Sequence, residues 1–115
     1  MFRNKVRSTV VPTVTLKDQE GYAVGMDGVK VAAAGDFVFG IVTFGRPANE
    51  ASEVQTGGEC EAIVNGGSTA IAAEDPLTGG ASGMLIKATL GTHKVRAYAK
   101  EAATASGSTI TVMLT

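Results

Sequence analysis

The sequence predicts an all-β protein: a small single-domain β-barrel or sandwich of short strands with an extended N-terminal arm. Val, Thr and Gly are abundant whereas Leu is scarce, a composition typical of short strands joined by tight turns. Short segments alternate apolar and polar residues with the period of a strand, and glycine-rich turn signals separate them. The length of 115 residues is enough for one core and too short for two domains.

Residues 1–19 form the predicted arm and first edge strand. The segment "STVVPTVTLK" places Val10, Pro12, Val14 and Leu16 on one face. Because Pro12 has no backbone N–H to donate, this segment is expected at a sheet edge or in an extended arm, not in a central strand.

Residues 20–115 form the predicted β-rich domain, whose first part contains turn pairs and one buried strand. The pairs Asp27-Gly28 and Gly35-Asp36 predict tight turns. The run "FVFGIVTF" is apolar on both faces and is expected in the middle of the core. Gly40 within this run indicates a bulge or a close approach of the backbone.

A strand is predicted at "ECEAIVNG", with small apolar residues facing inward and glutamates facing outward. The preceding "GRPANEASEVQTGG" is expected to be a polar loop that leads into it. After a short strand at "TAIAA", the segment "EDPLTGGASG" is expected to be a long glycine-rich turn. The inward residues are Cys60, Ala62 and Val64, and the outward residues are Glu59 and Glu61.

Three further strands complete the predicted fold. Lys94, Arg96, Tyr98 and Lys100 are expected to face outward. Residues 97–105 also have the propensity for a helical turn, but a strand that runs into a turn is favoured. The inward residues are Met84, Ile86, Ala88 and Leu90 in "MLIKATL", Val95, Ala97 and Ala99 in "KVRAYA", and Ile110, Val112 and Leu114 in "STITVMLT".

The charges separate a basic N-terminus from an acidic body, although the formal net charge is only −1. Arg3, Lys5 and Arg7 precede the first acidic residue, so the arm is either a solvated terminus or a segment that docks on an acidic protein surface. Cations without aromatic stacking partners are a weak basis for nucleic-acid binding, and no direct nucleic-acid partner is predicted. No signal peptide and no membrane-spanning run is visible, and no membrane contact is predicted.

Side chains that carry chemistry are few, and no catalytic, cofactor-binding or metal-binding residue is predicted. His93 lies in a predicted turn without a nucleophile motif around it, and one His with one Cys cannot supply the four ligands of a structural zinc site. Glu59 and Glu61 share a strand face, but the aromatic platforms typical of glycosidases are missing. Lys87 lies within a strand, not at the hairpin tip that a lipoyl or biotinyl lysine requires. Cys60 is the only cysteine, which excludes an internal disulfide and indicates assembly in a reducing cytoplasm.

Three stretches of the sequence resemble the capsid cement, or decoration, proteins of tailed bacteriophages. They are "DGVKVAAAGDFVFGIVTFG", "EVQTGGECEAIVNGGSTAIAAEDPLTGGASGMLIKAT" and "KVRAYAKEAATASGSTITVML". The second contains a "GDPL"-like step, with Glu74 where glycine is usual, followed by a "G-x-L-x-K-A" strand. The third contains Arg96-Ala97-Tyr98 before "EAAT". These are packing and turn motifs, and residues 1–19 lie outside the resemblance.

This resemblance implies a small β-rich protein, commonly a trimer, that binds the outside of a mature phage head and stabilises it against the pressure of the packaged DNA. The implied partners are the major capsid protein lattice and further copies of the chain. The protein would be made in the host bacterial cytoplasm and held on the outer capsid surface of the virion.

The predicted contacts lie mainly in the arm. Met1 to Pro12 is expected to order only on contact with a neighbouring copy or with the shell, where it can add a strand to a sheet edge. The polar loop "GRPANEAS" offers a second docking surface. The candidate contact residues are Phe2, Arg3, Lys5, Arg7, Val10, Pro12, Arg46, Pro47 and Asn49.

Two alternatives to a capsid protein stay open. One is a non-catalytic virion module that binds glycans or a host surface, although the absence of Trp counts against sugar binding. The other is a small enzyme with an unrecognised site. A pocket that gathers His93, Cys60 and acidic residues would favour the enzyme.

Overall fold

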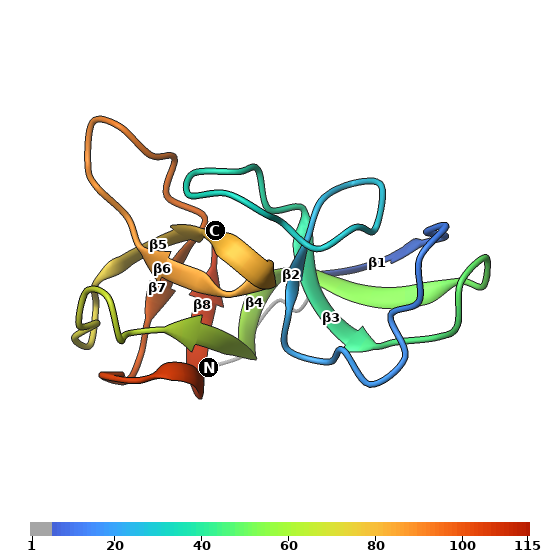
Figure 1. Ribbon diagram of the computed structural model, residues 1–115. Helices are drawn as coiled ribbons and strands as arrows, with labels where there is room; N and C mark the ends of the chain where they lie inside the picture. The colour runs from blue at the N-terminus through green and yellow to red at the C-terminus, as the bar shows by residue number, and fades with distance from the viewer. Residues whose placement is uncertain (1–5) are drawn as a thin grey trace.

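The computed structural model describes residues 6–115 and contains eight strands and one short 3-10 helix, which confirms the all-β prediction. The elements in chain order are β1 (Val6–Val10), β2 (Ala23–Val24), β3 (Gly40–Phe44), β4 (Ser52–Asn65), β5 (Pro76–Gly79), η1 (Ala81–Gly83), β6 (Leu85–Lys87), β7 (Ala97–Ala99) and β8 (Ser106–Leu114). Figure 1 shows that they fall into two parts joined by the long strand β4.

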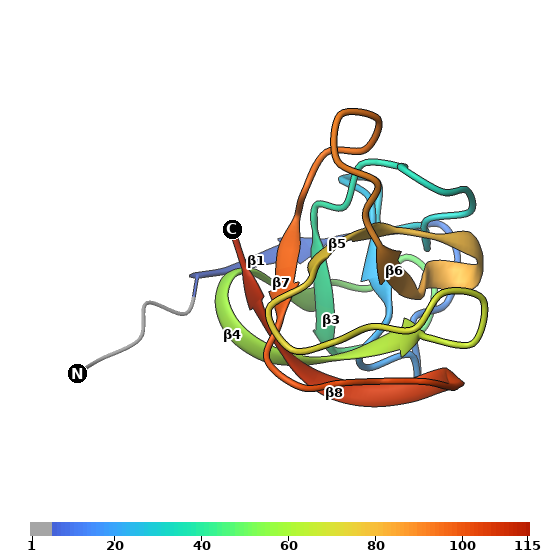
Figure 2. The same cartoon turned by 90° about the vertical axis from the view of Figure 1, so that its left-hand side faces the viewer.

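The first part is a closed five-strand barrel, on the left in Figure 1. The C-terminal half of β4 pairs with β8, and the order continues through β7, β5 and β6, all antiparallel. The barrel closes where Val64 of β4 pairs in parallel with Leu85 of β6. Figure 2 shows β8 running alongside β4. The barrel encloses the larger hydrophobic core, which contains Ala62, Val64, Leu77, Leu85, Ala97, Ala99, Ile110, Val112 and Leu114 among others.

The second part is an open sheet, on the right in Figure 1. The N-terminal half of β4 lies between β1 and β3, and β2 pairs with the far edge of β3. Its core is small and consists of Val10, Leu16, Val24, Val42 and Val54, with Phe39 packed against them. Among residues 6–115, β1 has a strand partner on one edge alone, so it is an edge strand.

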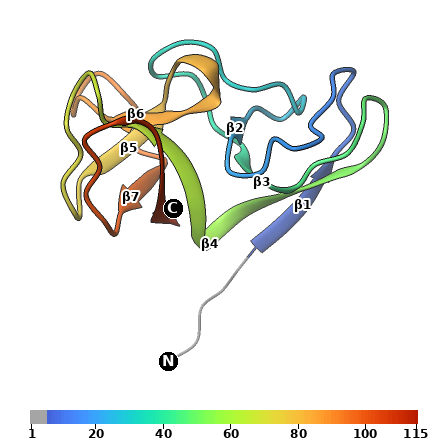
Figure 3. The same cartoon turned by 60° about the horizontal axis from the view of Figure 1, so that its bottom comes forward.

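The two parts meet at a bend in β4, which Figure 3 shows. Pairing of β4 with β1 ends at Gly57, and pairing with β8 begins at Gly58. Gly58 has a φ of +86°, a conformation that other residues adopt at a cost. The buried Gln55 side chain fixes the bend, because its amide nitrogen donates to the carbonyls of Gly57 at 2.9 Å and Glu59 at 2.8 Å. These two hydrogen bonds therefore hold the bend in a defined geometry.

Arg96 ties the two parts together a second time. Its guanidinium donates hydrogen bonds to the carbonyls of Val38 at 2.6 Å, Phe39 at 3.1 Å and Thr56 at 3.3 Å, and also to the carbonyl of Thr115. Burial lowers the pKa of Arg96 from its ordinary value. The prediction that Arg96 faces solvent is wrong, because its long side chain lies across the junction where several carbonyls need donors.

Several sequence-based assignments agree with the structure. Ala97 and Ala99 face inward, and residues 97–105 form a strand that runs into a turn. Ile110, Val112 and Leu114 are buried on β8 as expected. The expected close approach at Gly40 is also confirmed, since a Cβ atom there would lie 2.7 Å from the Gln55 carbonyl oxygen.

Two segments assigned to loops are strands. Strand β4 begins at Ser52, so most of "SEVQTGG" is not loop, because the buried Val54 and Gln55 pair with β1 and β3. Strand β5 occupies Pro76–Gly79 within the expected glycine-rich turn. Glycine is needed there because a Cβ on Gly79 would lie 2.7 Å from the Asp36 carbonyl oxygen.

The structure contradicts the prediction of which side chains in "MLIKATL" face inward. Leu85 is fully buried, whereas Leu90 is 72% exposed. Strand β6 spans three residues only, and the need to close the barrel against Val64 turns Leu85 inward. Ala88 is buried as expected.

Three other expectations need correction. Val14 is exposed, unlike Pro12 and Leu16 on its predicted face, because the regular strand ends at Val10. Phe37 is exposed, and so is Phe44, so only the middle of "FVFGIVTF" is core. The segment "TAIAA" contributes one isolated bridge, between Ile71 and Ala103, in place of a strand.

Part of the predicted arm is a strand of the open sheet. Val6–Val10 pairs with β4 within the same chain, so this part of the arm does not wait for a neighbour in order to form a strand. Pro12 is also fixed, since its carbonyl accepts a hydrogen bond from the Asn49 amide at 2.8 Å. The prediction of ordering on contact now concerns residues 1–5, which lie outside the described residues.

Candidate docking face and adjoining groove

The docking face is defined here as β1 together with Val11, Pro12 and the loop at residues 44–51. It brings together Arg7, Val10, Pro12, Arg46, Pro47 and Asn49 of the predicted contact residues. Phe2, Arg3 and Lys5 lie outside the described residues. Figure 1 shows β1 running from the middle of the molecule toward the open-sheet end.

The loop in the docking face is pinned by hydrogen bonds at both ends. The Gly45 amide donates to Oε2 of Glu20 at 2.8 Å, and the Arg46 amide donates to Oγ of Ser52 at 2.9 Å. The Arg46 carbonyl accepts from the Leu16 amide at 2.9 Å. The loop is therefore preorganised and loses little conformational entropy on binding.

The exposed side chains of this face differ in part from those predicted. Val10 belongs to the small core and Pro12 is also buried, so neither side chain is available for contact on the face. Sequence reasoning missed Val11, which is 64% exposed, and Phe44, which is 53% exposed. Val10 and Val11 are consecutive residues of an extended segment, so their side chains point to opposite faces. This alternation could have identified Val11 as an exposed residue.

Charged groups on the face are held in place by neighbours. The Arg46 guanidinium lies over the Phe44 ring at 4.9 Å from its centroid and within 3.8 Å of a carboxylate oxygen of Glu50. Arg7 lies 3.7 Å from a carboxylate oxygen of Glu53, which also accepts a hydrogen bond from Thr43 at 3.0 Å. The positive charges are thus presented at fixed positions.

The outer edge of β1 presents backbone groups at alternate residues. On β4 the Glu53 carbonyl accepts a hydrogen bond from Oγ1 of Thr43, so it points toward β3. The next residue, Val54, therefore points toward β1, where it pairs with Ser8. It follows that Ser8 directs its backbone N–H and C=O toward β4, and Thr9 directs its own outward.

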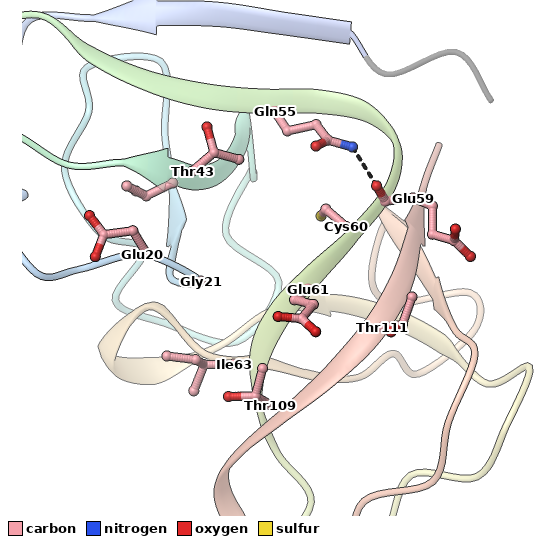
Figure 4. Close-up of a pocket in the computed structure, with 11 residues that line it drawn as sticks. Glu20, Gly21, Thr43, Gln55, Glu59, Cys60, Glu61, Ile63, Thr109 and Thr111 are labelled. Atoms are coloured by element: carbon pink, nitrogen blue, oxygen red, sulfur yellow. Dashed lines mark hydrogen bonds between the residues drawn. The ribbon is translucent and has the colours of Figure 1, made fainter.

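A groove of about 480 Å³ lies beside this face, between the open sheet and the barrel (Figure 4). The bend in β4 forms its back, with β3 on one side and β8 on the other. The lining residues are Glu20, Gly21, Val42, Thr43, Gln55, Glu59, Cys60, Glu61, Ile63, Thr109 and Thr111.

The groove gathers some, but not all, of the residues that sequence analysis named for a possible active site. It contains Cys60 and three glutamates but not His93, which lies in a turn where its Nδ1 accepts a hydrogen bond from the Thr89 amide at 3.1 Å. Glu59 is engaged by an ion pair with Lys100. The pocket that would favour an enzyme is therefore not formed by the described residues.

Residues 6–115 contain no group of three or more His, Cys, Asp or Glu side chains placed to hold a metal ion. Within the same range, no helix is long and apolar enough to span a membrane. The short helix η1 has three residues.

The fold defines a class of small β proteins in which a closed barrel carries an open sheet. No known protein family matches the sequence, and no curated protein matches it. Among solved structures, the chain is similar to the crystal structure of the head fiber gp8.5 N base in bacteriophage phi29, with a TM-score of 0.66 and 18% sequence identity. The match covers 97% of this chain and 95% of that chain, so the shared fold extends over nearly the whole of both.

Proposed function

We propose that this chain is a structural protein of a bacteriophage virion that binds the outer surface of the mature head as a decoration protein. The observation that carries the proposal is the fold that it shares, over 97% of its length, with the base of a phage head fiber. The sequence motifs that resemble capsid cement proteins support the same class of protein from a separate direction.

The docking face supplies two kinds of contact for such a role. The outward backbone groups of β1 can hydrogen-bond to an extended segment of the shell, as in β-strand addition. Val11 and Phe44 add apolar contacts beside this edge, and Arg46 adds a positive charge. Backbone pairing supplies affinity, while the neighbouring side chains select the partner segment.

Modest affinity for each copy is sufficient for this function. A head offers many equivalent positions, and an oligomer that engages several of them at once gains avidity without any new contact. Our proposal therefore includes a homotrimer bound to the major capsid protein lattice. Its role there is to stabilise the shell against the pressure of packaged DNA.

Co-sedimentation with phage heads tests the proposal. The purified protein is mixed with expanded, undecorated heads and, in parallel, with compact precursor heads, and the bound protein is quantified. We expect saturable binding to expanded heads and little binding to precursors. Equal and weak association with both would contradict the proposal, and saturable binding to whole host cells would favour the host-surface alternative.

A matched pair of variants assigns the docking face in the same assay. Phe44→Ser removes an exposed apolar group of the face, whereas Leu90→Ser removes an exposed apolar group in the loop between β6 and β7. We expect Phe44→Ser to weaken head binding at least about tenfold, the effect of a good apolar interface contact. Leu90→Ser should bind like the parent, and the reverse pattern would place the docking face elsewhere.

A further inference from the structure

A second pocket, of about 440 Å³, lies on the outside of the barrel and shares no lining residue with the groove. Tyr98 of β7 and Met113 of β8 pair across neighbouring strands, and both line this pocket. Tyr98 is 44% exposed. At Tyr98, β7 pairs with β5 on one side and with β8 on the other, so no strand edge is open here. A partner must therefore engage the pocket through side chains.

Glu74 lines the same pocket from a strained turn before β5. Its φ is +74°, in the left-handed region that disfavours residues with a side chain and suits glycine. The Glu74 amide donates a hydrogen bond to the Ala99 carbonyl at 2.6 Å, which fixes the turn beside β7. Glycine would form the same hydrogen bond without strain. The strained glutamate therefore points to a use for its side chain.

The charges of the pocket favour a cation. Within residues 6–115, the exposed Glu74 carboxylate has no hydrogen-bond or ion-pair partner. Lys100 is the one cation among the lining residues, and it forms an ion pair with Glu59. Because Glu59 neutralises Lys100, the charge of Glu74 is left uncompensated and the pocket is negative.

An arginine side chain matches both the ring and the carboxylate. A guanidinium is planar, stacks on an aromatic face such as that of Tyr98, and donates two parallel hydrogen bonds to a carboxylate such as that of Glu74. The docking face already contains this combination, since the Arg46 guanidinium lies over the Phe44 ring and beside the Glu50 carboxylate. In the pocket the ring and the carboxylate are present without the arginine.

We propose that this pocket binds an arginine side chain of a partner protein. The guanidinium stacks on Tyr98 and pairs with Glu74, and Met113 contacts the methylene stem of the arginine. The pocket gives the barrel a contact surface of its own, separate from β1 in the open sheet, as Figure 1 shows for the two strands β7 and β1. This inference does not depend on head binding, because small arginine derivatives test it on the isolated protein.

Titration followed by nuclear magnetic resonance tests the proposal. The nitrogen-15 protein is titrated with N-acetyl-arginine methylamide and, in parallel, with N-acetyl-citrulline methylamide, a neutral compound of nearly the same shape. We expect saturable shifts of the amide signals of Tyr98, Ala99 and Met113 with the arginine compound, and binding of the citrulline compound at least about fivefold weaker. Equal binding of the two compounds, or no saturable shift with the arginine compound, would overturn the proposal.

Variants of the pocket identify the two contacts. Glu74→Gln should weaken binding of the arginine compound at least about fivefold, and Tyr98→Leu should weaken it about threefold. Glu61→Gln removes an exposed carboxylate outside the pocket and should bind like the parent. Thermal melting first confirms that each variant folds. An equal loss in Glu61→Gln and Glu74→Gln would show attraction to the overall charge of the protein, which would overturn the assignment to this pocket.

Glycine at position 74 separates binding from folding. Glu74→Gly should raise the melting temperature by about 2–4 °C, because it relieves the strained φ, and should abolish the response to the arginine compound. A lower melting temperature with undiminished binding would show that the glutamate serves the turn and not the pocket. Titration with methyl β-galactoside examines a sugar as the occupant, and shifts of the Tyr98 and Met113 signals by the sugar but not by the arginine compound would overturn the proposal.

Discussion

The barrel and the open sheet share one continuous strand, β4, but they differ in the size of their cores and in whether their strand edges are paired. The barrel closes on itself, so its five strands leave no open edge, and the larger core of fifteen buried residues fills it and extends to Ala23 and Ile41 of the open sheet. The open sheet has a core of five buried residues and leaves the outer edge of β1 without a strand partner among residues 6–115. An unpaired edge is a hazard that natural proteins usually cover. Under our proposal, this edge is the one that binds the shell.

This difference predicts unequal costs for the same substitution in the two cores. Leu85→Ala in the barrel should lower the free energy of unfolding by about 3–5 kcal/mol, because the closed barrel cannot collapse around the cavity. Leu16→Ala in the open sheet should cost less, about 2–3 kcal/mol, because the neighbouring loops can relax. Urea unfolding measures both values. Equal losses would mean that the open sheet is packed as rigidly as the barrel.

The next-largest loss of stability is expected when the hydrogen bonds of Arg96 are removed, since they link the barrel and the open sheet. Arg96→Met keeps most of the side-chain volume but leaves the carbonyls of Val38, Phe39 and Thr56 without this donor. We expect a loss of about 2–3 kcal/mol, in the range for buried groups that lose a charged partner.

Hydrogen exchange then shows whether removing the Arg96 hydrogen bonds loosens the junction alone or the whole protein. Hydrogen exchange should accelerate first in residues 38–39 and in the strands of the open sheet, while β5 and β6 stay protected. Lys100→Met is the control, because it removes a cation that forms a surface ion pair with Glu59. Uniform acceleration throughout the barrel would contradict the idea of a junction between two units.

The sequence predicted the barrel better than the junction, and the reason is physical. Strand β8 alternates without interruption, because one of its faces is buried and the other is not, so its pattern alone identifies Ile110, Val112 and Leu114 as core. The alternation of apolar and polar residues did not predict correctly which side chains of β6 face inward. This strand has three residues, and its pairing with β4, which closes the barrel, determines which of them is buried. Local sequence does not encode that distant constraint.

Sequence reasoning predicted only part of the docking face, because the rest depends on strand pairing between distant segments. Pro12 signalled an edge strand nearby, and the polar loop signalled an exposed surface, and both lie together in the structure. The pairing of β1 with β4 was not predicted, because residues 52–58 contain glycine and polar residues that resemble a loop. Burial of Gln55 at the bend explains that composition, since its amide must reach two carbonyls.

A pair of proline substitutions separates the two edges of β1. Thr9 directs its N–H outward, so Thr9→Pro should leave the melting temperature within about 2 °C of the parent while weakening binding to expanded heads about tenfold or more. Ser8 directs its N–H toward β4, so Ser8→Pro should lower the free energy of unfolding by about 1–3 kcal/mol.

The two variants serve as each other's control. Melting curves and head co-sedimentation are measured on both. Full-strength head binding by Thr9→Pro would mean that the shell does not use this edge. In that case the loop that contains Arg46 and Phe44 would carry the docking alone.

The smallest expected effect belongs to a surface carboxylate of the barrel. Asp75 precedes β5, and its Oδ2 accepts a hydrogen bond from the Ala72 amide at 2.8 Å and lies 3.5 Å from Nζ of Lys87. The Ala72 hydrogen bond, together with the Lys87 charge, lowers the pKa of Asp75 below its usual 3.8. The folded state therefore binds the proton less tightly than the unfolded state.

The difference between the folded and unfolded pKa values of Asp75 determines how its contribution to stability changes with pH. The stabilisation from ionised Asp75 is fully present above the unfolded pKa and is lost as the pH falls through the lower folded pKa. Asp75→Asn should thus lower the melting temperature slightly near about pH 7 and have almost no effect near about pH 2, where the parent carboxylate is also neutral. Because Lys87 is exposed and Asp75 is partly exposed, the difference should shrink further in about 1 M salt, which screens the Lys87 charge. Lys87→Met isolates that charge and should reproduce only the salt-sensitive part. A loss of stability that is equal at both pH values would mean that the charge of Asp75 contributes nothing to the barrel, because the parent carboxylate is ionised at only one of them.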